Sequence, residues 1–128
     1  MKIHTNVINV ATETAKKSDV VRGKVGAVCF TNKGHIIAFA HNAILYGHKK
    51  HFTIHAEIAL LAKLVKLRAG ARFGIKNLNI LVVRYRAEDD ALGIAKPCVN
   101  CRAALKITGM KVFYSDTHAN IVELRNTK

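Results

Sequence analysis

Apolar residues recur along the chain with two different periods, and these periods predict the order of its helices and strands. Helical spacing within residues 4–19 predicts an amphipathic helix, carried by Val7, Ile8, Ala11 and Ala15. Two β-rich runs follow at 25–31 and 35–41, and the Asn-Lys-Gly between them predicts a hairpin. A loop is expected over residues 42–53.

The second half of the chain alternates between helices and strands. Helical spacing without glycine or proline runs from 54 to 68, and Gly70 is expected to mark the end of this helix. Residues 78–84 are almost continuously apolar, as in a strand that is covered on both faces. After an acidic turn region, a further helix is expected over residues 98–108, ending at Gly109.

Two short strands at 111–115 and 120–124 are close enough along the chain to form a hairpin. The resulting order α-β-β-α-β-α-β-β predicts an α/β domain in which one mixed sheet lies between layers of helices. The strands on either side of the 98–108 helix are expected to be parallel, through a right-handed crossover. The length of 128 residues fits a single domain spanning 1–128.

The composition bounds the class of protein. No apolar run is long enough to span a bilayer, and the amino terminus lacks the apolar core of a secretory signal. Three cysteines are too few for a disulfide scaffold, and Cys29 is expected to be a small buried hydrophobe. We therefore expect a soluble, cytoplasmic protein without a membrane partner.

The charge is strongly positive. Lys and Arg number 21 against 8 Asp and Glu, which gives +13 with neutral histidines. Such an excess favours phosphate-bearing partners, among them RNA, single-stranded DNA and nucleotides. A basic surface that serves solubility alone is the alternative.

Cys98 and Cys101 have the spacing of metal ligands. Three residues apart on a helix, their side chains would share one face, and Pro97 suits a first helical turn. A helix amino terminus stabilises thiolates, the form that binds metal. With His55 as third ligand, they would form a zinc site whose fourth position is open, as in catalytic zinc sites.

Glu57 follows His55 by two residues, and such neighbours point in nearly opposite directions on a regular helix. They would converge only at a helix start, for which Thr53 is a possible cap. Ala56 between them leaves room for a flat substrate. Because zinc lowers the pKa of water to about 7, a carboxylate beside it suits proton transfer.

A structural zinc site is the alternative to a catalytic one. His51 and His55 could close a four-ligand site with Cys98 and Cys101. This arrangement leaves Glu57 without a role, and the spacing of 43 positions from His55 to Cys98 is too long for a zinc finger.

Together, His-Ala-Glu at 55–57 and Pro-Cys-Val-Asn-Cys at 97–101 resemble the zinc-dependent cytidine deaminase-like superfamily, whose base deaminases carry the H-x-E…P-C-x-x-C signature. Val-Gly-Ala-Val at 25–28 is similar to the first strand of that fold, and the expected element order matches along nearly the whole chain. The resemblance implies a three-layer α/β/α fold with a mixed five-stranded sheet, a carboxy-terminal β-hairpin and one zinc ion per chain.

The resemblance also implies a role for each motif residue. His55, Cys98 and Cys101 would hold zinc, while Glu57 would move the protons as water replaces the cytosine amine and ammonia leaves. The implied substrate contacts are Asn42, which would hold the sugar, Ala56, which would help to read the base, and Val28. Arg102 matches an arginine that supports the zinc thiolates in free-cytidine deaminases, and Pro97 would also lie behind the ligands.

The substrate class is less well specified. A histidine as first ligand is similar to dCMP deaminases, tRNA adenosine deaminases and polynucleotide cytidine deaminases, whereas the carboxy-terminal hairpin is similar to free-cytidine deaminases. Lys49 and Lys50 precede His55 and could meet a 5′-phosphate or a strand backbone, although a solvated basic loop explains them equally well.

We therefore interpret the sequence as a zinc-dependent hydrolase that deaminates a cytidine-type nucleoside or nucleotide. One alternative is a cytosine or adenine deaminase acting on RNA or single-stranded DNA. Another is a catalytically silent, zinc-stabilised protein that binds nucleic acid. A homo-oligomer is expected, because small deaminases of this superfamily commonly assemble.

Overall fold

A computed structural model describes residues 2–20, 23–45, 52–116 and 120–124. Its helices and strands are α1 (Thr5–Lys16), β1 (Lys24–Thr31), β2 (Ile36–His41), β3 (Ala43–Leu45), β4 (Phe52–Ile54), α2 (Ala56–Leu67), α3 (Ala69–Phe73), the 3-10 helix η1 (Ile75–Asn77), β5 (Leu78–Arg86), β6 (Ala91–Gly93), α4 (Val99–Thr108), β7 (Lys111–Ser115) and β8 (Ile121–Glu123). Within the described residues, no helix is long and apolar enough to cross a membrane.

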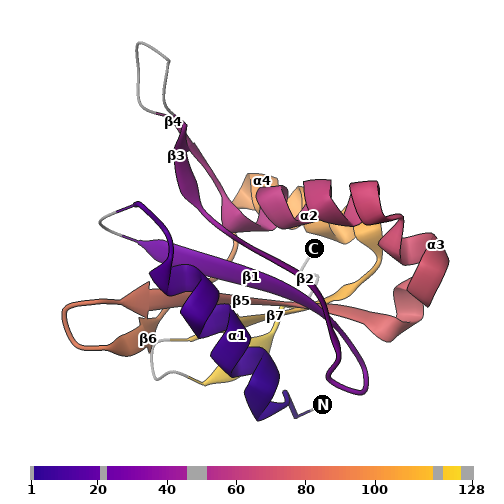
Figure 1. Ribbon diagram of the computed structural model, residues 1–128, viewed down its shortest axis with the longest axis horizontal. Helices are drawn as coiled ribbons and strands as arrows, with labels where there is room; N and C mark the ends of the chain where they lie inside the picture. The colour runs from indigo at the N-terminus through magenta and orange to yellow at the C-terminus, as the bar shows by residue number, and fades with distance from the viewer. Residues whose placement is uncertain (1, 21–22, 46–51, 117–119, 125–128) are drawn as a thin grey trace.

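One mixed sheet lies at the centre of the fold, with α1 on one face and α2 and α4 on the other (Figure 1). Its strand order is β2-β1-β5-β7-β8, and β6 pairs with β5. The β5–β7 pair is parallel and is connected through α4, while the other pairs are antiparallel. The three-layer α/β/α prediction is confirmed, as is the parallel pairing.

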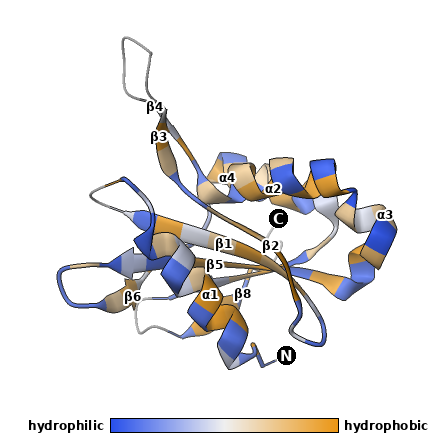
Figure 2. Cartoon of the chain, in the orientation of Figure 1, coloured by the Kyte–Doolittle hydropathy of each residue, from blue (hydrophilic) through white to orange (hydrophobic). Residues whose placement is uncertain are grey.

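A separate hydrophobic cluster covers each face of the sheet, so the apolar run of β5 is buried on both sides as expected (Figure 2). One cluster joins the sheet to α2 and α4, and the other joins it to α1. Gly26 allows α1 to approach β1 closely, because a Cβ atom there would lie 2.4 Å from the backbone oxygen of Ala11. The sheet is therefore held between two packed layers, which fixes the positions of its strand ends.

The structure corrects several details of the sequence interpretation. The expected loop at 42–53 contains β3 and β4, which form a small separate hairpin. The acidic region before residue 98, expected to be a turn, contains the short strand β6, which was not predicted. The helix expected over 54–68 ends at Leu67, and its C-cap Arg68 adopts a left-handed conformation with φ of 51°. Gly70, which was expected to mark this end, lies inside α3. Propensity did not reveal this end, because an arginine seldom occupies that conformation.

Candidate metal centre and active site

The start of α2 brings His55 and Glu57 to the same site. His55 is the N-cap residue, with an extended backbone (φ −73°, ψ 147°), and the helix begins at Ala56. Glu57 is the second helical residue. Because His55 is extended and lies outside the helix, its side chain and that of Glu57 need not point in opposite directions as they would within a regular helix. The expected convergence at a helix start is present, but Thr53 lies in β4 and is not the cap.

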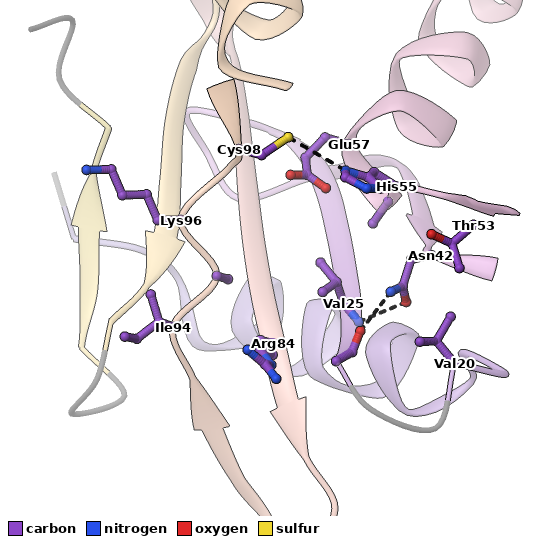
Figure 3. A pocket seen from close by; sticks show the side chains of 13 residues that line it. Val20, Val25, Asn42, Thr53, His55, Glu57, Arg84, Ile94, Lys96 and Cys98 are labelled. Carbon is purple, nitrogen blue, oxygen red and sulfur yellow. Dashed lines mark hydrogen bonds between the residues drawn. The ribbon is translucent and has the colours of Figure 1, made fainter. Parts of the chain in front are cut away.

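The start of α4 supplies the two cysteines in a similar way. Cys98 is the N-cap residue, again extended, and Cys101 is the third residue of the helix. Pro97 therefore precedes the helix and is not in its first turn, which corrects the sequence expectation. His55 Nδ1 lies 3.2 Å from Cys101 Sγ. It lies 3.9 Å from Cys98 Sγ (Figure 3).

The three side chains fit a zinc ion. Their ligand atoms all lie within 4.8 Å of one another, and no other residue of the described ranges joins the group. Tetrahedral zinc with ordinary Zn–N and Zn–S bonds separates a nitrogen from a sulfur ligand by about 3.6 Å. The two observed separations lie on either side of this value. Nitrogen and sulfur ligands in this number are those of a catalytic zinc site with one open position.

The two thiols lie in different electrostatic environments. The peptide N–H of Cys101 lowers the pKa of the exposed Cys98 thiol below its ordinary value, as expected at a helix amino terminus. Burial raises the pKa of the Cys101 thiol to about 12, and the Glu57 carboxylate acts in the same direction. A divalent cation between these groups would reverse the effect on Cys101, because a coordinated thiol is deprotonated.

A cavity of about 370 Å³ opens beside these residues (Figure 3). Such a volume is at the lower end of the range of about 300–1,000 Å³ usual for small-molecule sites. Its lining comes from the ends of β1, β2, β4, β5 and the segment before α4, and comprises Val20, Gly23, Val25, Asn42, Thr53, His55, Ala56, Glu57, Arg84, Ile94, Ala95, Lys96 and Cys98. Glu57 is only 5% exposed and is part of this lining.

Asn42 lies in the cavity wall and organises the neighbouring backbone. Its Oδ1 accepts hydrogen bonds from the Val25 N–H (3.0 Å) and the Ser18 hydroxyl (2.6 Å), and its Nδ2 donates to the Gly23 carbonyl (2.7 Å). These bonds tie β1 and the segment before it to the end of β2. One Nδ2 hydrogen is left to donate toward the cavity.

Other sequence-predicted residues lie in different places. Val28 is fully buried in the cluster that packs against α1, on the opposite face of the sheet from the zinc ligands, so its prediction as a substrate contact is wrong. The strand alternates its faces, and Val25 lines the cavity instead. Lys49 and Lys50 lie outside the described residues, as does His51 of the alternative zinc site.

The support of the zinc thiolates by Arg102 stays a prediction. The Arg102 side chain lines a second cavity, between α4 and the β7–β8 pair, and within the described chain it forms no hydrogen bond to a sulfur atom. Pro97 is buried directly before Cys98.

Arg84 and Lys96 line the first cavity although the sequence interpretation did not select them. The Arg84/Arg86 pair in a basic chain was the only signal for Arg84.

Comparison with known protein families identifies the family of this chain. Residues 1–116 match the family described as "Cytidine and deoxycytidylate deaminase zinc-binding region". The chain belongs to this family. Its cofactor is one zinc ion, in agreement with the His-Cys-Cys group. Comparison with curated proteins gives no match.

Solved structures of deaminases share the fold of this family member. Cytidine deaminase from Burkholderia pseudomallei has a TM-score of 0.67 and 20% identity, covering 96% of this chain and 92% of that one. For dCMP deaminase from the cyanophage S-TIM5 the TM-score is 0.64 and the identity 24%, with 88% and 81% covered. Cytidine deaminase from Mycobacterium leprae has a TM-score of 0.58 and 18% identity, with 92% and 90% covered. At these identities the likeness shows the fold.

Proposed function

We propose that this protein is a zinc-dependent hydrolase that converts the cytosine of a nucleoside or nucleotide to uracil and releases ammonia. The observation that carries the proposal is the position of Glu57, a buried carboxylate beside three zinc-type ligands at the end of a cavity. Family membership supports the same chemistry. Solved structures with the same fold include a dCMP deaminase and cytidine deaminases.

His55, Cys98 and Cys101 are the proposed zinc ligands, and Glu57 is the proposed proton carrier. When bound there, zinc supplies a Lewis acid that makes water a nucleophile near neutral pH. Glu57 takes a proton as the water oxygen bonds to C4 of cytosine, and delivers a proton to ring nitrogen N3. It then carries the second proton of that water to the amino group. The C4–N bond breaks, ammonia leaves, and uracil remains.

The surrounding residues suit substrate positioning. Ala56 lines the cavity between His55 and Glu57, and its small side chain leaves room for a planar base. Asn42 has one Nδ2 hydrogen that none of the described residues accepts, and this hydrogen would bind a sugar oxygen. Because the other polar atoms of Asn42 are engaged with the backbone, its orientation is set before the substrate arrives.

The test is uracil formation from cytidine, deoxycytidine, CMP, dCMP and short cytosine-containing RNA and single-stranded DNA. Zinc-loaded wild-type protein is compared with Glu57→Ala as the blank. Conversion of at least one substrate by the wild type alone is expected. If zinc-loaded wild type converts none of them, the cytosine assignment is wrong.

A strand substrate is the second candidate, and the observation that favours it is the net charge of +13. Counterion release would strengthen binding to a polyanion, so strand turnover should fall steeply with salt concentration. The same panel separates the two candidates, since a salvage-type enzyme would convert the monomers alone. A zinc-stabilised binding protein without catalytic activity is less consistent with the buried Glu57. Burying a carboxylate costs free energy, and such a protein would have no need of one beside its metal ligands.

A further inference from the structure

Arg84 is held firmly at its backbone. It lies near the end of β5, opposite Val25 of β1 and opposite Gly93 of β6. Its N–H donates to the Ser115 hydroxyl at 3.3 Å, and that hydroxyl donates to the Gly93 carbonyl at 2.7 Å. Strands on both sides therefore fix the point from which the Arg84 side chain leaves the sheet.

The Arg84 guanidinium faces the cavity at the end away from Glu57 and Cys98 (Figure 3). It lies beside Gly23, where a Cβ atom would stand 3.8 Å from its Nη2 atom. Gly23 is also the residue whose carbonyl accepts the Asn42 amide. The order along the cavity is therefore metal ligands and Glu57, then Asn42, then Arg84.

Arg84 has no acidic partner among the residues that the structure describes. Arg86, two residues further along the same strand, differs because it forms an ion pair with Asp89 at 3.2 Å. Lys96 is the other cation in the cavity lining, but its amino group points away from the cavity (Figure 3). Among the described residues that line the cavity, Arg84 is thus the cation that faces it without an acidic partner.

We propose that Arg84 binds a phosphate group of the substrate and makes the enzyme selective for phosphate-bearing cytidine over the free nucleoside. An arginine fork matches two phosphate oxygens, and such charge-assisted pairs are roughly twice as strong as neutral hydrogen bonds. The phosphate belongs either to a free nucleotide or to a strand backbone, and the chemistry of the contact is the same. This inference rests on the proposed deaminase function.

The first test compares kcat/KM for dCMP, deoxycytidine and a short deoxycytidine-containing oligonucleotide. The enzymes are wild type, Arg84→Gln and Arg86→Gln, the last as a matched control on the same strand. Arg84→Gln should lower kcat/KM about 10- to 100-fold for a phosphate-bearing substrate. Deoxycytidine turnover should not change. Arg86→Gln should change none of the three rates.

The pattern of loss identifies the source of the phosphate. A fall with dCMP alone assigns a free nucleotide, and a fall with the oligonucleotide alone assigns a strand. An equal fall for deoxycytidine and both phosphate-bearing substrates would overturn the proposal, because Arg84 would then be structural. Unchanged rates for all three substrates would also overturn it.

A binding measurement keeps the test independent of turnover. In the Glu57→Gln background, dissociation constants for dUMP and deoxyuridine are measured by calorimetry with and without Arg84→Gln. Only dUMP should bind more weakly when Arg84 is lost, and Arg84→Lys should restore part of the difference. Equal affinity of dUMP and deoxyuridine in the Arg84-containing protein, together with no effect on a bound oligonucleotide, would contradict the proposal. Failure of the deaminase function itself would show separately, as wild-type protein that converts no substrate.

Discussion

The two ends of the cavity are built on different principles. At the reaction end, His55, Cys98 and Cys101 converge from two helix starts, and their ligand atoms lie within 4.8 Å of one another. At the far end, Asn42 is satisfied almost completely by the protein, through bonds to Ser18, Gly23 and Val25.

The reaction end thus offers its side chains to a metal ion, whereas the far end is held together by hydrogen bonds within the protein. Loss of a residue at the reaction end should remove zinc or catalysis. Loss of a residue at the far end should weaken substrate binding and lower the stability of the fold while zinc remains bound, whereas loss of a ligand also removes the stability that zinc supplies. The four predictions below test that separation, beginning with the largest effect.

Cys101→Ala should remove zinc, abolish deamination and destabilise the fold. The free energy of unfolding should fall by about 4 kcal/mol or more, since loss of a bound metal belongs to the largest mutational effects. Zinc content by mass spectrometry and denaturant unfolding measure both effects. Cys29→Ala is the matched control, because this fully buried thiol lies among apolar residues and is not a ligand. Equal zinc loss in Cys29→Ala would contradict the assignment.

Glu57→Gln should leave zinc and fold intact and reduce kcat by about 10²- to 10⁴-fold, the usual contribution of a positioned acid or base. Glutamine keeps the shape of the side chain but cannot accept the proton. Uracil formation and zinc content are measured on the same preparation. A variant that retains more than a tenth of wild-type kcat would exclude Glu57 as the proton carrier.

Asn42→Ala should lower the free energy of unfolding by about 1–3 kcal/mol, because the Val25 N–H and the Gly23 carbonyl lose their partner. Zinc content should stay at one per chain. Asn42→Asp keeps the acceptor for Val25 but sets a carboxylate oxygen against the Gly23 carbonyl, so it should be no less destabilising. Zinc loss in Asn42→Ala would show that the two ends of the cavity are not independent.

Ser18→Ala should have the smallest effect, a loss of about 0.5–1.5 kcal/mol in unfolding free energy. The single hydroxyl hydrogen is shared between Asn42 Oδ1 and the Asn42 carbonyl, and the hydroxyl oxygen accepts the Val20 N–H. Asn42 Oδ1 keeps its second partner, the Val25 N–H, when Ser18 is changed. The variant should retain its zinc and its kcat. A loss as large as that of Asn42→Ala would mean that Ser18, and not Asn42, organises this wall.

The sequence revealed the reaction end because its residues lie in two short motifs. His55 and Glu57 are two residues apart, and Cys98 and Cys101 are three apart, so each pair is positioned by one helix start. The metal-ligand spacing of the cysteines and the carboxylate beside His55 thus indicated a site before the fold was known. The layers and the β5–β7 crossover were also predictable, because hydrophobic periods and connection rules are local or nearly local.

The far end was less predictable because it depends on strand register and distant segments. Ser18, Gly23 and Asn42 meet only through the pairing of β1 with β2, and Arg84 joins them through the pairing of β1 with β5. Val28 illustrates the same limit. Successive residues of a strand point to opposite faces, so a strand can be predicted while the inward-facing residue is chosen wrongly.

The most direct test of the account is a zinc titration of metal-free protein, with ammonia release and bound zinc measured in parallel. The substrates are the cytosine-containing nucleosides, nucleotides and oligonucleotides of the panel described above. We predict that activity rises with bound zinc and that both reach their limit at one zinc per chain. Ammonia release that is already maximal without zinc, or full zinc binding without any release from the whole panel, would contradict a zinc-dependent cytosine deaminase.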